Sequence, residues 1–260
     1  MDLTTTPADG VPPVPSAARL VGVLGACGGA GTSLLAAALA RALRRRVGAT
    51  ALVDLDVPGA GLDVHLGIDG AAGARWSDLA GARGTVDGDA LVAALPRWGA
   101  VPVLSGGHRD ATAPDEAVVL DTTTAVLRTG HRVVLDLPRP WICTAAAATL
   151  VGAADAVVLV TPLRTGGVAG ALAALRQLDD VGAPHVLPVA CRPAHGRVDE
   201  RGLGEVLGHP VVATVGWDPR LAGRLERGHG PSTGRRAPLG RAATRLVDAL
   251  TGTAARREAA

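Results

Sequence analysis

The stretch LVGVLGACGGAGTS occupies residues 20–33 and joins an apolar run to a glycine-rich loop. Its apolar beginning predicts a buried strand over 20–24. A helix is expected over 33–46, because Leu35, Leu39 and Leu43 recur every four residues and three arginines close its last turn. A glycine loop between such a strand and helix gathers backbone N–H groups and a helix N-terminus at one point. The segment therefore predicts an anion site at the start of an α/β fold.

The same alternation of short apolar strands and longer helical stretches continues along the chain. Strands separated by helices predict a three-layer, doubly wound, mostly parallel sheet, in which ligands bind at the carboxyl ends of the strands. We expect one domain over 19–252, a flexible Pro-rich leader over 1–18 and a charged tail over 253–260. Further strands are expected at 51–54, 101–104, 132–136, 156–160, 186–190 and 211–215.

The composition excludes several classes of site. The 260 residues include no phenylalanine or tyrosine, and all 26 basic residues are arginine. A Schiff-base lysine, a Tyr/Lys catalytic pair and a base-stacking sheet of Phe and Tyr are therefore excluded. An orthodox Walker A loop is excluded too, because it needs a lysine on the β and γ phosphates. The net charge of +2 does not by itself indicate a polyanionic partner.

Membrane and nucleic-acid partners find little support in the sequence. Residues 20–40 lack charge, but their glycines split them into strand, loop and helix rather than a membrane span. The last helix, expected over about 239–251, has an alanine-rich stripe suited to packing on the domain. The arginine clusters 44–46 and 235–236 are interpreted as a helix end and a solvated loop. We expect no sequence-specific nucleic acid, at most peripheral membrane association, and reduced cysteines in the cytoplasm.

The residues that could carry chemistry lie in the glycine loop and at two strand ends. The loop's backbone N–H groups suit phosphate oxygens, and carboxylates at neighbouring strand ends suit Mg²⁺ and its waters. One of the carboxylates could orient an attacking water. The alternative interpretations are a tight turn that binds nothing and aspartates that cap helices. The expected phosphate-binding residues are Gly28, Gly29, Ala30, Gly31, Thr32 and Ser33, the metal ligands Ser33, Asp54 and Asp136, and the catalytic residues Asp56 and Asp136.

At these residues the chain resembles the deviant Walker A ATPases that include the MinD and ParA proteins. Within them it is most similar to the CpaE/TadZ-like group, which includes septum-site-determining (Ssd) proteins. The resemblance implies an ATP- and Mg²⁺-dependent homodimer in the cytoplasm that positions machinery at a pole or septum. In this branch it also implies a link to tight-adherence pilus, secretion or division proteins. The resemblance covers about residues 19–251 and rests on the loop 28–33, the blocks 54–56 and 62–63, Trp76–Leu79, Asp136–Arg139 and Trp217–Pro219 with Gly228.

The chain departs from the family pattern where that pattern places its lysines. Cys27 and Thr32 stand at the two lysine positions, and the family's base-recognising asparagine is replaced within 190–193. Losing a preorganised cation of this kind costs about a hundred- to a thousandfold in rate. We therefore expect ATP binding with little or no hydrolysis, at most a weak ATPase. The alternatives are an active ATPase in which Arg139 or Arg164 compensates, and a nucleotide-free dimeric scaffold.

Overall fold

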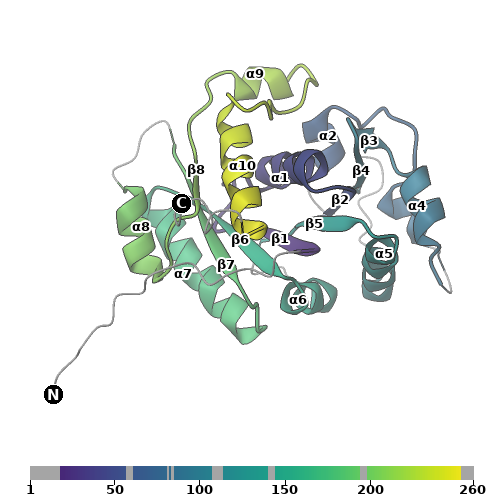
Figure 1. Ribbon diagram of the computed structural model, residues 1–260, viewed down its shortest axis with the longest axis horizontal. Coiled ribbons are helices and arrows are strands. Elements are labelled where there is room, and N and C mark those ends of the chain that lie inside the picture. Colours follow the sequence, from purple (N-terminus) through teal and green to yellow (C-terminus); the bar gives the residue numbers. More distant parts are fainter. Residues whose placement is uncertain are drawn as a thin grey trace.

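The computed structural model describes residues 18–56, 61–80, 82, 85–106, 114–139, 144–193 and 198–252. Eight strands form one sheet in the order β3-β4-β2-β5-β1-β6-β7-β8, and the described helices surround it (Figure 1). The strands are β1 (Leu20–Gly25), β2 (Thr50–Asp54), β3 (Arg97–Trp98), β4 (Val101–Leu104), β5 (Arg132–Asp136), β6 (Ala156–Pro162), β7 (Val186–Cys191) and β8 (Ala213–Val215). The helices are α1 (Thr32–Arg46), α2 (Leu62–Leu66), α3 (Trp76–Leu79), α4 (Gly88–Ala94), α5 (Glu116–Arg128), α6 (Ala145–Gly152), α7 (Thr165–Asp180), α8 (Glu200–Leu207), α9 (Leu221–Leu225) and α10 (Pro238–Leu250).

The predicted three-layer, mostly parallel architecture is confirmed. Each of the seven strands expected from the sequence is present, and the pairings among them are parallel. The sequence pattern missed β3, which has two residues and pairs antiparallel with β4 across a turn at Gly99. Gly99 has φ 64, a left-handed conformation that glycine adopts without a Cβ clash. A strand this short has no periodicity to detect.

The helices divide between the two faces of the sheet (Figure 1). α1, α10 and the short α2 pack on one face, on side chains such as Val23 and Val158. α4, α5, α6, α7 and α8 pack on the opposite face, on side chains such as Leu135 and Leu159. The central strands are apolar on both sides because both faces are covered. None of the helices in the described part of the chain is long and apolar enough to cross a membrane.

Helix α1 packs closely on the sheet because its buried face is mostly alanine. Leu35, Leu39 and Leu43 fill the spaces between these small side chains, and all three are almost fully buried. Small residues let a helix axis approach its neighbour, so the start of α1 is held firmly against the end of β1. The buried alanines of α1 are Ala36, Ala37, Ala38, Ala40 and Ala42.

The connectivity of the sheet reverses at β1, its central strand. β1 lies between β5 and β6, and it leads through α1 to β2 on one side. β5 leads through α6 to β6, on the other side of β1. A crevice forms beyond the carboxyl ends of the strands at such a reversal, and it is the usual ligand site of open α/β sheets. The predicted tail and, apart from Ala18, the predicted leader lie outside the described residues.

Candidate functional site

The glycine-rich loop that follows β1 directs its backbone toward the crevice. Gly29 and Gly31 adopt left-handed conformations, with φ 71 and φ 85, which other residues adopt only with strain. Gly31 is the N-cap of α1 and offers no side-chain acceptor to the first turn. The N–H groups that begin α1 are therefore left for a ligand, and the positive end of the helix dipole favours an anion there.

The outer face of this loop is open. A Cβ added at Gly29 would meet no atom within 4 Å, and one at Gly28 would meet only Arg139 Nη1, at 3.8 Å. The loop forms one wall of a cleft of about 530 Å³. Residues 28–33, Asp56 and Asp136, all expected from the sequence, line this cleft together. The cleft is also lined by Gly25, Cys27, Leu34, His65, Leu137, Arg139 and Leu225.

Asp136 lies at the end of β5, directly beside the loop. Sheet register places it opposite Val23 of β1 and opposite Asp54 of β2. Only 2% of Asp136 is exposed, and burial raises its pKa well above the usual range. The negative charge of Asp54 raises the pKa further, whereas a hydrogen bond with the Ser33 side chain lowers it. A cation in the cleft would favour the charged form, so the site is suited to a metal that binds together with an anion.

Asp54, expected as a metal ligand, is hydrogen-bonded within the protein. Its carboxylate accepts hydrogen bonds from the backbone N–H groups of Leu62 at 2.9 Å and Asp56 at 3.0 Å, and from the Ser105 hydroxyl at 2.8 Å. Burial raises the pKa of Asp54, and these hydrogen bonds oppose the rise. Asp54 is not among the described residues that line the cleft. Its carboxylate instead fixes the backbone of Asp56, which does line the cleft.

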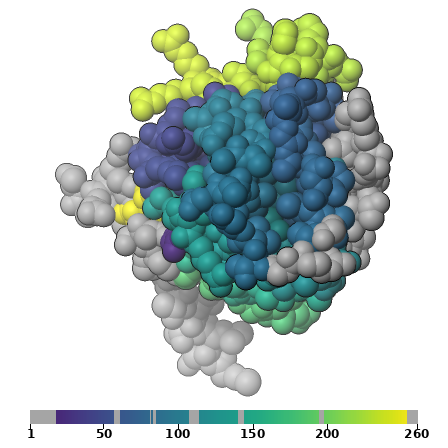
Figure 2. All heavy atoms as spheres, turned by 90° about the vertical axis from the view of Figure 1, so that its right-hand side faces the viewer, coloured from purple at the N-terminus to yellow at the C-terminus, as the bar shows by residue number. Residues whose placement is uncertain are grey.

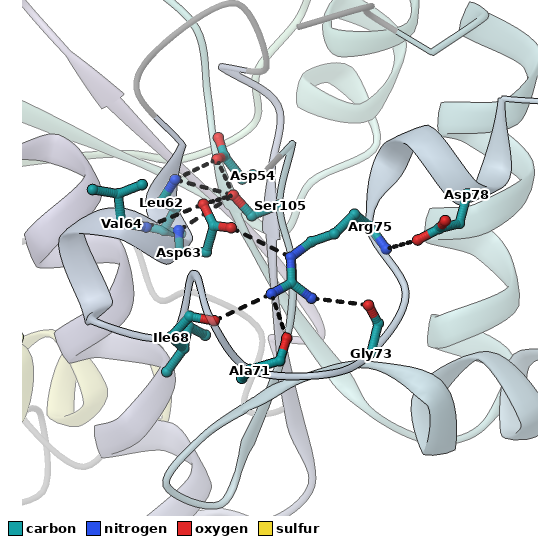
Figure 3. Close-up of polar contacts among 10 residues, drawn as sticks. All are labelled: Asp54, Leu62, Asp63, Val64, Ile68, Ala71, Gly73, Arg75, Asp78 and Ser105. Carbon is teal, nitrogen blue, oxygen red and sulfur yellow. Dashed lines mark hydrogen bonds and ion pairs between the residues drawn. The ribbon is translucent and has the colours of Figure 1, made fainter. Parts of the chain in front are cut away.

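A buried ion pair extends this polar cluster away from the cleft (Figure 3). Ser105 Oγ lies 3.4 Å from Asp63 Oδ1, and Arg75 Nε lies 3.3 Å from Asp63 Oδ2. The Arg75 guanidinium also donates to three backbone carbonyls. Trp76, fully buried, donates from Nε1 to the Asp54 carbonyl at 2.7 Å. Asp54, Asp63 and Arg75 are thus joined in one buried polar network.

Two arginines approach the loop from opposite sides. Arg139 lines the cleft near Gly28, just beyond β5. Arg164, which precedes α7, places Nη2 3.5 Å from Cys27 Sγ. These are the two arginines that the sequence singled out as substitutes for the missing lysines. The structure brings both to the loop, so positive charge is present beside the backbone N–H groups.

A second cavity, of about 610 Å³, adjoins the first and shares residues 28–31 with it. Its far wall is largely apolar and includes Pro219, Leu221 and Trp217, whose residue surface is 61% exposed. Cys191 and Arg192 belong to the segment 190–193, where the family resemblance implies a base-recognising residue, and both line this cavity. Burial raises the pKa of the Cys191 thiol to about 11, so this side chain lines the cavity as an uncharged thiol at neutral pH. The two cavities together form a site with a polar half and an apolar half.

Comparison with known proteins relates this chain to curated sequences and to solved structures. No protein-family model matches it. Two proteins of Mycobacterium tuberculosis, from strains CDC 1551 and H37Rv and both described as uncharacterized, are 38% identical to it over 234 residues. The match covers 89% of this chain and 63% of each relative, so the chain spans less than two thirds of their length.

The solved structures show the fold. A ParA family ATPase from Chlorobium tepidum has a TM-score of 0.74 at 17% identity, covering 90% of this chain and 98% of that one. The cell division ATPase MinD of Pyrococcus furiosus has a TM-score of 0.73 at 20% identity, covering 91% and 100%. MinD of Pyrococcus horikoshii, solved with Mg-ADP, has a TM-score of 0.67 at 18% identity, covering 91% and 97%. The chain therefore has the fold of the MinD and ParA ATPases.

Proposed function

We propose that this chain binds a Mg²⁺–ATP complex in the paired cavities and turns it over slowly or not at all. The observation that carries the proposal is the open glycine loop, whose residues line one cleft together with Ser33, Asp56 and Asp136. Phosphate oxygens would accept hydrogen bonds from residues 28–33 at the positive end of α1. The MinD structure solved with Mg-ADP has the same fold, which supports this choice of ligand.

The donor set beside the loop fits magnesium bound through a nucleotide. No group of three or more His, Cys, Asp or Glu side chains among the described residues is placed to hold a metal alone. Mg²⁺ commonly takes one or two protein oxygens and completes its shell with waters and substrate phosphates. Ser33 and Asp136 would supply those oxygens. Asp54 would position Asp56 by accepting a hydrogen bond from its backbone N–H group. The ion would neutralise phosphate charge, while Asp56 would hold a water near the cleft.

The expected rate of ATP hydrolysis depends on Arg139 and Arg164. Arg139 and Arg164 can balance phosphate charge, but each reaches the loop from its side rather than from within it. A lysine within the loop would carry its ammonium group to the β and γ phosphates. We therefore place the protein as a nucleotide-binding switch, with an active ATPase that uses these arginines as the alternative. The adjoining apolar cavity, with the exposed indole of Trp217, would hold the base.

The cellular role that we propose follows from the resemblance and the shared fold. Nucleotide binding would favour a homodimer that organises tight-adherence pilus, secretion or septum-site machinery at a pole or septum in the cytoplasm. A structure of MinD from Aquifex aeolicus in complex with MinC shares the fold, which supports a protein partner for this chain. Association with membrane would be peripheral.

Calorimetric titration with Mg²⁺–ATP tests the proposal. Gly28→Glu introduces a negative side chain into the open cleft without backbone strain, because φ at Gly28 is not positive and no backbone atom lies near the added Cβ. Gly70→Glu is the matched control, since Gly70 is also exposed and open. We expect wild type and Gly70→Glu to bind ATP, and Gly28→Glu to bind at least about tenfold more weakly.

Phosphate release from ATP separates the alternatives. Turnover that is lost in Asp56→Ala or Asp136→Ala would establish the active ATPase. ATP binding without turnover would support the switch. No heat and no thermal shift at millimolar nucleotide would overturn both and leave the nucleotide-free scaffold.

A further inference from the structure

A basic pocket lies at the opposite end of α1 from the glycine loop. It has a volume of about 370 Å³ and forms between the end of α1 and the exposed side of α10. The two helices lie side by side and pack on each other (Figure 1). In Figure 2, yellow-green residues near the C-terminus lie along the upper edge of the molecule, above purple residues near the N-terminus. The pocket is lined by Arg46, Arg235, Arg241, Thr244, Arg245 and Asp248.

The pocket unites arginines from clusters that the sequence separates by almost 190 residues. Arg46 Nη1 lies 2.6 Å from Asp248 Oδ1 and 3.4 Å from the Thr244 carbonyl, which ties the end of α1 to α10. Arg45 reaches the Thr233 carbonyl at 3.3 Å on the segment before α10. Arg241 Nη1 holds the Arg236 carbonyl at 2.7 Å. The wall is therefore built by specific hydrogen bonds rather than by free side chains alone.

The charge of the described residues that line this pocket is unbalanced. Its lining includes four guanidinium groups and one carboxylate, Asp248, which already pairs with Arg46. Among the described residues, no carboxylate forms a salt bridge with Arg235 or Arg245. Arg241 and Arg245 are four residues apart on α10, where like charges repel. Arg241 also lies near the N-terminus of α10, where the helix dipole disfavours a cation.

Both placements are electrostatically unfavourable. Neutral residues at these positions would make α10 more stable unless an anion binds there. Arginines 44–46 are explained by their place at the C-terminal end of α1, where the helix dipole favours a cation. That explanation does not apply to the three other arginines of the pocket, Arg235, Arg241 and Arg245. We propose that the pocket binds the linked phosphate groups of a small polyphosphorylated molecule. Guanidinium groups match phosphate oxygens with paired N–H donors, and the net excess of positive charge suits a ligand with several negative charges.

The shape of the surface favours a small ligand over a bilayer. The exposed residues of α10 are Arg241 and Arg245, while its apolar side chains are buried or partly buried against the domain. No large apolar side chain of α10 is thus left to insert among lipid tails. The arginines surround one hollow rather than following a line, as a nucleic-acid backbone would require. The site is separate from the glycine loop, because the 15 residues of α1 span about 22 Å.

Inorganic tripolyphosphate, without divalent cations, is the probe for this pocket. Its binding is measured by calorimetry and by the thermal midpoint in the 260-residue wild type and three variants. Arg235→Ala/Arg245→Ala removes two lining arginines without breaking a hydrogen bond described above. Arg176→Ala/Arg201→Ala is the matched control, with the same loss of charge on exposed helical positions elsewhere. Gly28→Glu tests whether the probe binds at the glycine loop instead.

We expect the pocket variant to bind tripolyphosphate about tenfold more weakly or worse, while the control and Gly28→Glu retain a site of wild-type affinity. Without ligand, the thermal midpoint of the pocket variant should not fall below that of wild type, because Arg245→Ala removes the repulsion between Arg241 and Arg245 on α10.

Four results would overturn the proposal. These are no binding to wild type at millimolar probe, equal weakening in the control variant, and loss of all binding in Gly28→Glu. The fourth is binding of duplex DNA or phosphatidylglycerol vesicles through these arginines when tripolyphosphate neither binds nor competes. Comparison with Gly28→Glu distinguishes a failure of this proposal from binding of polyphosphate at the glycine loop.

Discussion

Replacing Arg75 by methionine should destabilise the domain strongly. Arg75 donates to Asp63 Oδ2 at 3.3 Å and to the carbonyls of Gly73, Ile68 and Ala71 at 3.1, 3.2 and 3.0 Å. Asp63 has only 1% of its side chain exposed, so Arg75→Met leaves a buried carboxylate without its cation (Figure 3). Removing one partner of a buried pair costs about 3–5 kcal/mol. For a domain of this size, the thermal midpoint should fall by roughly 6–20 °C.

Calorimetry and urea unfolding followed by circular dichroism would measure the loss. Arg201→Met is the matched control, because Arg201 pairs with Glu205 but has 89% of its side chain exposed, and it should leave the midpoint unchanged. Asp63→Asn and the double variant complete a cycle. We expect the double variant to lose less stability than the sum of the single variants, because both members of the pair are then uncharged.

The reasoning would be refuted if Arg75→Met were no more destabilising than Arg201→Met. Strict additivity in the cycle would refute the direct pairing of Arg75 with Asp63. The first result would mean that packing such as that of Trp76, rather than any contact of Arg75, holds this part of the chain. The second would assign the loss to the backbone carbonyls that Arg75 contacts, rather than to its pair with Asp63.

Three further predictions concern the cleft and its neighbour. Burial raises the pKa of Asp136, so the folded state holds its proton more tightly than the unfolded state, and the wild type loses stability as pH rises above about 4. Asp136→Asn should therefore be more stable than wild type at pH 8, with the gap closing toward pH 4; a gap that widens in acid would contradict this assignment. Cys191, whose pKa burial raises to about 11, should react with iodoacetamide at pH 8 at least about a hundredfold more slowly than an ordinary cysteine, as mass spectrometry of its peptide would show. Trp217→Leu should abolish the fluorescence change on adding Mg²⁺–ATP and weaken binding about two- to tenfold, and an unchanged signal would place the base elsewhere.

The sheet and its loop were predictable because their signals are local. Apolar runs mark β1, β5 and β6, and the glycines that follow β1 mark the turn into α1. Parallel register then brings the end of β5 beside the loop, so the proximity of Asp136 and Ser33 follows from the topology. The short β3 and the two-residue turn before β4 carried no comparable pattern.

Side-chain partnerships between distant segments were not predictable. Asp54 lies at a strand end like Asp136, but its carboxylate accepts a hydrogen bond from the hydroxyl of Ser105, 51 residues later. Arg75 gave no sign of burial, because its role depends on Asp63 and on the carbonyls around it. The sequence alone favours a helix end for the arginines at 44–46 and a solvated loop for those at 235–236. Only the packing of α10 on α1 shows that their neighbourhoods form one pocket.

The two outer strands of the sheet determine how copies of this chain can associate. One edge is the two-residue β3, and the other is the three-residue β8. So short an edge offers a second chain only a few backbone hydrogen bonds, which protects the monomer against runaway strand-to-strand growth. Self-association by a continuous intermolecular sheet is correspondingly weak. Any stable pair must therefore be joined through loops and helix surfaces.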